Sequence, residues 1–230
     1  MLDAALDLFL GSRCVGCDAP GRMLCHACRA GLSRGAGIAW PTPTPPGLAT
    51  PWACETYDGA VRALVVGHKD RGQWGHRRVL AGLLATAVRA ATEGLDPRVP
   101  LLLVAAPSRP GAGRQRGYEP TAALVRTAAR LLRDERAVLA APLLVSRGAR
   151  DQAGLDASGR AANVRGSMRC SGAALRRVAR RRRVAHVVVC DDVLTTGATA
   201  REAQRALAAV GLDPVAIAVV AATRRASAPA

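Results

Sequence analysis

Short, continuously apolar runs that alternate with helical periods constrain the fold of this chain more than any other feature. The runs at 101–105, 184–190 and 215–221 are rich in branched residues, as strands covered on both faces should be. Helical spacing appears at 59–68, 76–93, 119–133 and 199–210. This alternation predicts an α/β fold around a parallel sheet, with ligands bound beyond the carboxyl ends of the strands.

Composition divides the 230 residues into four parts. Residues 1–34 hold a short helical pattern near 2–10 and a cysteine cluster. Residues 35–51 contain five prolines, which lack the amide donors of regular structure, and are predicted to be a linker. The α/β domain is expected over 52–224, followed by a tail at 225–230.

The cysteine cluster has the pattern CxxC-x7-CxxC, formed by Cys14, Cys17, Cys25 and Cys28. Four thiolates at this spacing can close a tetrahedral zinc site, and the short spacer favours a compact zinc knuckle. Because four protein ligands leave no open position, the zinc is expected to be structural. A redox CxxC pair and a plain thiol cluster remain alternatives. The other cysteines, Cys54, Cys170 and Cys190, are interpreted as small buried hydrophobes.

The stretch from Val187 to Thr199 carries the most chemistry. An apolar strand delivers Asp191 and Asp192 at its carboxyl end, and the small turn Thr195-Thr196-Gly197-Ala198-Thr199 leads into a helix. Thr199 and Glu202 have capping-box spacing, which predicts a helix start near Thr199. Backbone amides at such a helix start, together with the threonine hydroxyls, can bind a phosphate. The two carboxylates suit ribose hydroxyls, directly or through Mg²⁺.

With this combination the chain resembles the type I phosphoribosyltransferases, whose signature is an apolar strand, two acids and a Thr/Ser-Gly-Thr/Ser loop for phosphoribosyl pyrophosphate. The cysteine array narrows the resemblance to the ComF family of competence-associated, phosphoribosyltransferase-like proteins. The resemblance covers nearly the whole chain. Its other matching stretches are 57–62 leading to Lys69, 106–109, 116–118, and 150–155 continuing through Arg160 to Asn163.

The resemblance implies a role for each matching position. Asp191 and Asp192 would hold the ribose hydroxyls as candidate catalytic residues, and residues 195–199 would hold the 5-phosphate. Ser108 and Arg109 correspond to the pyrophosphate loop, Lys69 is a candidate phosphate contact, and Arg150 lies in a segment, 147–163, that resembles the flap over such sites. Where the family often has Arg-Gly-Phe/Tyr-Asn-Gln, this chain reads Arg-Gly-Tyr-Glu-Pro at 116–120, so the contacts of those polar side chains do not carry over.

The charge balance allows a second interpretation. With 33 basic and 17 acidic residues the net charge is +16, which favours phosphate-bearing partners. The arginines at 176–177 and 180–183 form a solvated surface or a binding strip for single-stranded DNA. Six scattered aromatic residues are too few for a base-stacking platform, so any DNA contact would be electrostatic.

Two functional hypotheses follow. The first is a phosphoribosyl pyrophosphate- and Mg²⁺-binding protein that transfers phosphoribose to an unidentified acceptor or binds the sugar phosphate as a sensor. The alternative is a nonenzymatic DNA-uptake factor that binds single-stranded DNA or a protein partner. No apolar run reaches the roughly 18–20 residues of a membrane span, and no secretory signal is evident, so a cytoplasmic protein is expected. Walker, G-x-S-x-G and H-E-x-x-H motifs are absent from the sequence.

Overall fold

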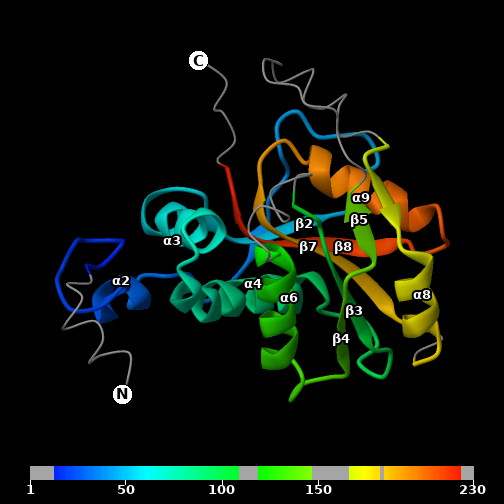
Figure 1. Cartoon of the computed structure of the whole chain (residues 1–230), viewed down its shortest axis with the longest axis horizontal. Coiled ribbons are helices and arrows are strands. Elements are labelled where there is room, and N and C mark those ends of the chain that lie inside the picture. The colour runs from blue at the N-terminus through cyan, green and yellow to red at the C-terminus, as the bar shows by residue number, and fades with distance from the viewer. Residues whose placement is uncertain (1–12, 109–118, 147–165, 182–183, 224–230) are drawn as a thin grey trace.

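The computed structural model (Figure 1) describes residues 13–108, 119–146, 166–181 and 184–223, and the structural statements below concern those ranges. Its centre is a six-stranded sheet with the strand order β1-β2-β8-β7-β3-β4. The strands are β1 (Gly37–Ile38), β2 (Pro51–Thr56), β3 (Leu101–Ala105), β4 (Val138–Ala141), β7 (His186–Leu194) and β8 (Pro214–Ala222).

The sheet is mostly parallel, as the sequence predicts. Only β1 runs antiparallel to its neighbour, β2, whereas the other four neighbouring pairs are parallel. β7 lies between β3 and β8, with Ala105 opposite Cys190 and Val219 opposite Asp191. The apolar, branched sequence of these inner strands suits a sheet that is buried on both faces. The predicted α/β class with a parallel sheet is confirmed.

Helices cover both faces of the sheet. One face packs against α3 (Gly59–Asp70), α4 (Arg77–Ala91) and α6 (Pro120–Leu131), and its core includes Leu84, Leu103 and Leu124. The other face packs against α9 (Ala198–Ala208) and a hairpin of β5 (Leu144–Ser146) and β6 (Met168–Cys170), followed by α8 (Gly172–Ala179). Alternate residues of β3 enter the two cores, because successive strand side chains point to opposite faces.

The connections of the sheet reverse direction between β3 and β7. From β3 the chain crosses through α6 on one face to β4, whereas from β7 it crosses through α9 on the other face to β8. The two crossovers therefore move away from each other, and β3 and β7 flank a topological switch point. In open α/β sheets, ligands bind at the carboxyl ends of such strands.

The cysteine-containing segment packs beside α3. It includes the short helix α2 (His26–Ala30), and Val15, Leu24 and Leu32 pack against the core of the α3 face. Figure 1 shows this segment at one end of the molecule, next to α3 and α4. The helix predicted near 2–10 and the tail at 225–230 lie outside the described residues.

Residues 35–51, predicted to be a linker, connect the cysteine segment to β2. They include β1, and beyond it the chain runs alongside α9 (Figure 1). Pro41 and Leu48 are buried there. This segment therefore also forms part of the packing around α9.

Candidate functional site

Asp191 and Asp192 lie within β7, near the switch point. The strand is longer than predicted and continues past the acids to Leu194. Adjacent strand residues face opposite sides of a sheet, which places Asp192 on the face covered by α3 and Asp191 on the face covered by α9. The amide of Asp192 donates to Asp191 Oδ1 at 2.8 Å, and the amide of Val193 donates to Asp192 Oδ1 at 2.9 Å.

Asp192 forms an ion pair with Lys69, the only lysine in the chain. The Lys69 Nζ lies 2.8 Å from Asp192 Oδ2 and 3.0 Å from Oδ1, although the two residues are 123 positions apart. Burial, the largest single influence, lowers the pKa of Lys69, but the carboxylates of Asp192 and Asp191 outweigh it and raise the pKa above its ordinary value. The ammonium at the end of α3 is therefore held in its charged form beside both acids.

Asp191 is in a different electrostatic environment. Removal from water, followed by repulsion from the neighbouring Asp192 carboxylate, raises the pKa of Asp191 well above its ordinary value of 3.8, while Lys69 lowers it. Ionisation of Asp191 is therefore disfavoured in the fold without a ligand. A cation or a hydroxyl donor bound beside it would favour the carboxylate.

The turn after β7 leads into α9. Thr195 and Thr196 are exposed, Thr199 is half-buried, and the helix begins at Ala198. Gly197 is the N-cap residue and has a φ of 72°, a backbone conformation that glycine adopts without a Cβ penalty. The first amides of a helix have no carbonyl partner one turn earlier and can bind an anion. In this structure the amide of Ala198 donates to Thr196 Oγ1 at 3.5 Å.

The predicted capping box at Thr199 and Glu202 is wrong. Thr199 lies inside the first turn, and Glu202 is buried at 3 % exposure, where its Oε1 accepts the amide of Met168 at 2.9 Å. Its carboxylate also pairs with Arg205, with Nε 2.7 Å from Oε2. Glu202 therefore joins α9 to β6, and the spacing that suggested a cap reflects a tertiary contact.

The end of β3 forms the other wall of the switch point. The amide of Ala106 donates to the carbonyl of Cys190 at 2.9 Å, which brings the chain before Ser108 beside β7. The Ser108 Oγ is buried and has no hydrogen-bond partner among the described residues. Arg109 and Arg150, and the rest of the flap segment at 147–163, lie outside the described residues.

The departure at Glu119 and Pro120 has a structural explanation. Glu119 is the N-cap of α6, and Pro120 occupies the first helical turn, where the missing amide of proline costs no hydrogen bond. The Pro120 carbonyl lies 3.3 Å from the Nε2 of His68, which is buried on α3. These two residues therefore begin a helix and join it to α3.

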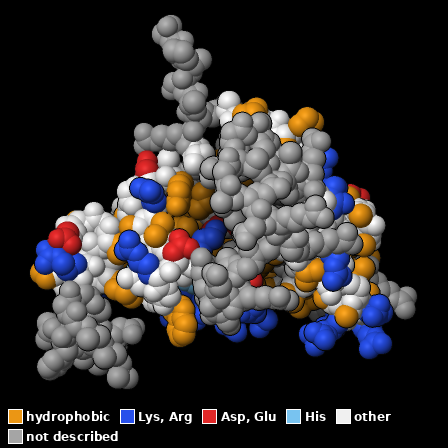
Figure 2. All heavy atoms as spheres, turned by 45° about the horizontal axis from the view of Figure 1, so that its top comes forward, with side chains coloured by type: hydrophobic (Ala, Val, Ile, Leu, Met, Phe, Trp, Pro, Cys, Tyr) orange, Lys and Arg blue, Asp and Glu red, His pale blue; other side chains and the backbone are white. Residues whose placement is uncertain are grey.

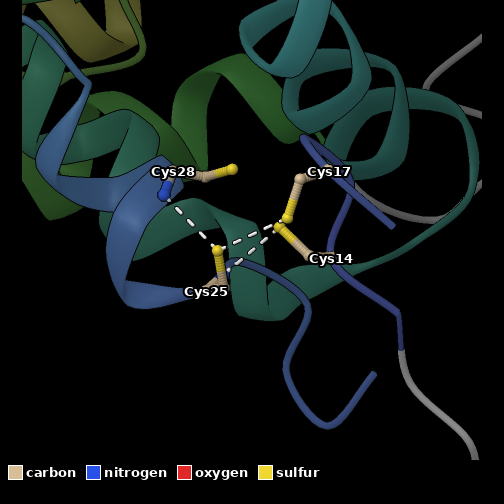
Figure 3. Close-up of side chains that lie close together, drawn as sticks. All are labelled: Cys14, Cys17, Cys25 and Cys28. Atoms are coloured by element: carbon tan, nitrogen blue, oxygen red, sulfur yellow. Dashed lines mark hydrogen bonds between the residues drawn. The ribbon is translucent and has the colours of Figure 1, made fainter. Parts of the chain in front are cut away.

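The four cysteines of the N-terminal cluster come together as predicted (Figure 3). Their sulfur atoms all lie within 4.8 Å of one another, and Cys17 Sγ is 3.6 Å from Cys25 Sγ. A tetrahedral zinc ion with bonds of about 2.3 Å needs sulfurs about 3.8 Å apart, so the donor set and its size fit. The exposed His26 does not belong to the group.

Backbone amides favour the thiolate of Cys14, whereas side-chain hydrogen bonds with the other three cysteines raise the pKa of Cys28 to about 12. The amides of Cys25 and Gly16 donate to Cys14 Sγ at 3.3 and 3.4 Å. Burial raises the pKa of the Cys14 thiol, but these amides and that of Cys17 outweigh it and lower the pKa to about 6. Thiolate is the form that binds a metal ion.

A cavity of about 280 Å³ lies at the opposite end of the sheet. It is lined by Pro100, Ala137, Val138, Leu139 and Arg181, at the amino ends of β3 and β4. None of the candidate site residues lines it. The switch-point residues therefore form their site independently of this cavity.

Sequence comparison gives one family match. Residues 126–229 match the phosphoribosyl transferase domain family. The matched segment is somewhat less than half of the chain; it includes β7, the turn at 195–199 and α9, whereas Lys69, Ser108 and the cysteine cluster lie before it. A search of curated proteins found no match. Among the described residues, no helix is both long and apolar enough to cross a membrane.

The sequence pattern did not reveal two features of the site. One is the pairing of Lys69 with Asp192, since the resemblance implied only that Lys69 contacts a phosphate. The other is a set of contacts from Arg201 and Gln204 on α9 to residues 46–49. These partners lie more than 120 positions apart along the chain, so no local periodicity could have indicated them.

Proposed function

We propose that this protein binds phosphoribosyl pyrophosphate with Mg²⁺ at the carboxyl ends of β3 and β7 and transfers the phosphoribosyl group to an acceptor. The observation that carries the proposal is the placement of two acids and a glycine-containing turn at the topological switch point, inside the segment that matches the phosphoribosyl transferase family. The four cysteines ahead of this domain support the finer resemblance to the ComF family.

Each part of the site has a task in this proposal. The 5-phosphate binds the turn at 195–199 and the first amides of α9. Asp191 and Asp192 bind the ribose hydroxyls, and their carboxylates would also hold Mg²⁺, which neutralises charge on the pyrophosphate. Ser108, at the end of β3, donates its hydroxyl to the pyrophosphate, while the ion pair with Lys69 holds the Asp192 side chain in place.

The reaction requires little chemistry from the side chains. The bond from C1 of the ribose to pyrophosphate breaks, its electron pair leaves with the pyrophosphate, and a lone pair of the acceptor forms the new bond to C1. Positive charge builds up on the ribose ring in between, and the carboxylates of Asp191 and Asp192 stabilise it. The remaining acceleration comes from holding the phosphoribosyl donor and the acceptor close together in the reactive orientation.

A thermal-unfolding titration of the zinc-loaded protein tests ligand binding. Phosphoribosyl pyrophosphate with Mg²⁺ at about 100 times its dissociation constant should stabilise the fold by about 2.7 kcal/mol, which raises Tm by about 5–10 °C. The D191N/D192N variant should fold and lose this shift. Asp213→Asn is the matched control, because Asp213 is exposed beside the amino end of β8, at the other end of the sheet. An equal shift in the double variant would reject the site.

A second candidate function rests on α8. Arg176, Arg177, Arg180 and Arg181 are exposed on and just after this short helix. Figure 2 shows a group of Lys and Arg side chains at the end of the molecule where Figure 1 places α8. Such a surface suits the phosphates of single-stranded DNA, bound by charge alone.

Matched charge reversals separate this function from the first. R176E/R177E/R180E and R126E/R130E/R133E each replace three exposed arginines, on and just after α8 or α6, so that net charge falls equally. If α8 binds single-stranded DNA, only the first variant should lose affinity for it, and the affinity of the wild-type protein for DNA should fall steeply with salt. Equal losses of DNA affinity in the two variants would indicate attraction by net charge alone. Both variants should retain the ligand-induced Tm shift.

A further inference from the structure

The proline-rich segment at 41–49, called the strap below, forms a closed loop anchored to the sheet. The amide of Ala39, just before it, donates to the carbonyl of Pro51, just after it, at 2.9 Å. Inside the strap, Thr44 Oγ1 donates to the carbonyl of Pro41 at 2.7 Å, and the amide of Leu48 donates to the carbonyl of Pro45 at 3.2 Å. Prolines also fix their own φ angles, so the strap keeps one shape at a low entropic cost.

Two side chains of α9 hold the strap by its backbone. Arg201 Nε donates to the carbonyl of Pro46 at 2.8 Å. Gln204 uses both ends of its amide, since its Nε2 donates to the carbonyl of Gly47 and its Oε1 accepts the amide of Ala49, each at 2.9 Å. Residues three apart on a helix share a face, so the two side chains form one contact row along α9.

The strap also touches the turn that starts α9. A Cβ placed on Gly197 would lie 3.0 Å from Pro41 Cγ, 3.2 Å from Leu48 Cδ2 and 3.3 Å from Pro45 Cδ. Gly197 itself is buried, whereas its neighbours Thr195 and Thr196 are exposed. The strap therefore packs directly against the centre of the turn and leaves the threonines accessible.

We infer that the strap is a positioning element for the phosphate-binding turn, and that Arg201 and Gln204 are positioning residues that act through it. The inference rests on the proposed function, because the turn is assigned there to the 5-phosphate. A turn held from behind at Gly197 keeps its amides in one arrangement before the ligand arrives. Less ordering is then required when the phosphate binds, which increases affinity.

The test compares ligands that use different parts of the site. In the full-length, zinc-loaded protein with Mg²⁺, R201A and Q204A should each weaken phosphoribosyl pyrophosphate and ribose 5-phosphate by on the order of tenfold. Inorganic pyrophosphate does not reach the turn at 195–199, so its affinity should stay unchanged. Arg201→Lys keeps a donor for the Pro46 carbonyl and should restore most of the loss. Binding is measured by calorimetric titration.

Arg205→Ala is the matched control. Arg205 lies on the same helix and donates to a backbone carbonyl at 2.9 Å, but its partner is Met168 in β6. Because Arg205 also pairs with the buried Glu202, this variant should lose at least as much thermal stability as R201A, and it should still keep its affinity for ribose 5-phosphate. If R201A and Q204A weaken all three ligands equally, or none, the positioning role is overturned while the proposed function stands. If the wild-type protein binds neither sugar phosphate, the proposed function fails as well.

Discussion

At the residue scale, the half-buried Asp191 beside the buried Asp192 is the most unusual feature of the site. Ionised Asp191 is unfavourable in the ligand-free protein, because desolvation and Asp192 raise its pKa well above 3.8. A strained charge of this kind is typical of functional sites, where a ligand relieves it. The unliganded fold is therefore less stable than it would be with a neutral side chain at this position.

Asp191→Asn should consequently raise the Tm of the ligand-free protein at pH 7. The sign follows from linkage: with a raised native pKa, the protonated form is favoured in the fold, and stability falls as pH rises through that pKa. Below the ordinary value of 3.8, Asp191 is protonated in both states and the gain should vanish. Each 1 kcal/mol corresponds to about 2–4 °C at this size. Thermal scans from pH 3.5 to 8 measure the effect.

Asp213→Asn is again the control, since Asp213 is exposed and outside the site. Its Tm difference from wild type should stay close to zero at every pH. A destabilised D191N protein at pH 7 would show that the charge on Asp191 supports the fold, contrary to the assignment.

Lys69 allows a direct test of its ion pair, because the chain has no other lysine. Its ammonium is paired with Asp192 and its pKa is raised, and both effects slow reaction with amine-selective reagents, which attack the neutral amine. We expect Lys69 to be acylated more slowly than free N-acetyl-lysine in the same tube, because a raised pKa and the ion pair both leave less of the neutral amine. Asp192→Asn should raise the rate. Peptide mass spectrometry measures both rates, and an equal rate in wild type would contradict the pairing.

At the scale of elements, β7, its turn and α9 form the unit on which the proposed chemistry depends. The sequence predicted this unit correctly in type, because a buried strand followed by a small turn and a helical stripe leaves a local periodic signal. The helix begins at Ala198, next to the predicted start near Thr199, but without the predicted capping box. The Thr199–Glu202 spacing fits a cap, but Glu202 is used to bind Met168 and Arg205 across the fold.

The contacts that shape the site could not be predicted in the same way. Arg201 and Pro46 are 155 positions apart, and the five prolines of residues 35–51 predict extended chain without indicating what it packs on. The sequence offered Lys69 as a candidate phosphate contact, and its pairing with Asp192 depends on the fold that brings α3 to β7. Local patterns thus predict which elements form, whereas the partners of polar side chains depend on the assembled structure.

Gly197→Ala tests how closely the strap packs on the turn. Its φ of 72° strains any residue with a Cβ, and three strap atoms lie within 3.3 Å of the added methyl. We expect a loss of about 2–4 kcal/mol in the free energy of unfolding, measured by urea titration, with strain and overpacking contributing together.

Two other glycines separate these contributions. Gly211 has a similar φ of 76° but open space around its Cβ position, so Gly211→Ala should show strain alone, about 1–2 kcal/mol. Gly82, within α4, has open space and a helical backbone, so Gly82→Ala should stabilise by up to about 1 kcal/mol. If the two substitutions at Gly197 and Gly211 lower the free energy of unfolding equally, the strap moves to accommodate the added methyl group and does not pack tightly on the turn.

At the scale of the whole molecule, the cysteine module and the switch-point site both contact α3. A Cβ on Gly16 would lie 3.1 Å from the Cβ of Ala60 in the first turn of α3, and a Cβ on Gly75, in the segment after α3, would clash with Met23 Cε. The last turn of the same helix carries Lys69. The module thus packs against both ends of the α3 region, on the side of the sheet opposite α9.

Zinc removal should therefore loosen the molecule unevenly. In a closed four-thiolate site, zinc binding supplies much of the free energy that keeps the surrounding segment folded. Removal of zinc by a chelator should therefore unfold residues 13–34 and weaken their packing on α3. Hydrogen–deuterium exchange should then rise in 13–34 and in peptides covering 59–76, while peptides of β7 and α9 keep their protection.

Cys14→Ser should reproduce this pattern and lose the zinc. Cys170→Ser, a change in β6 outside the cluster, should retain about one zinc per chain and wild-type exchange. Exchange that rises equally in α9 would show that the module supports the whole sheet, and unchanged exchange in 59–76 would show that it is independent of α3.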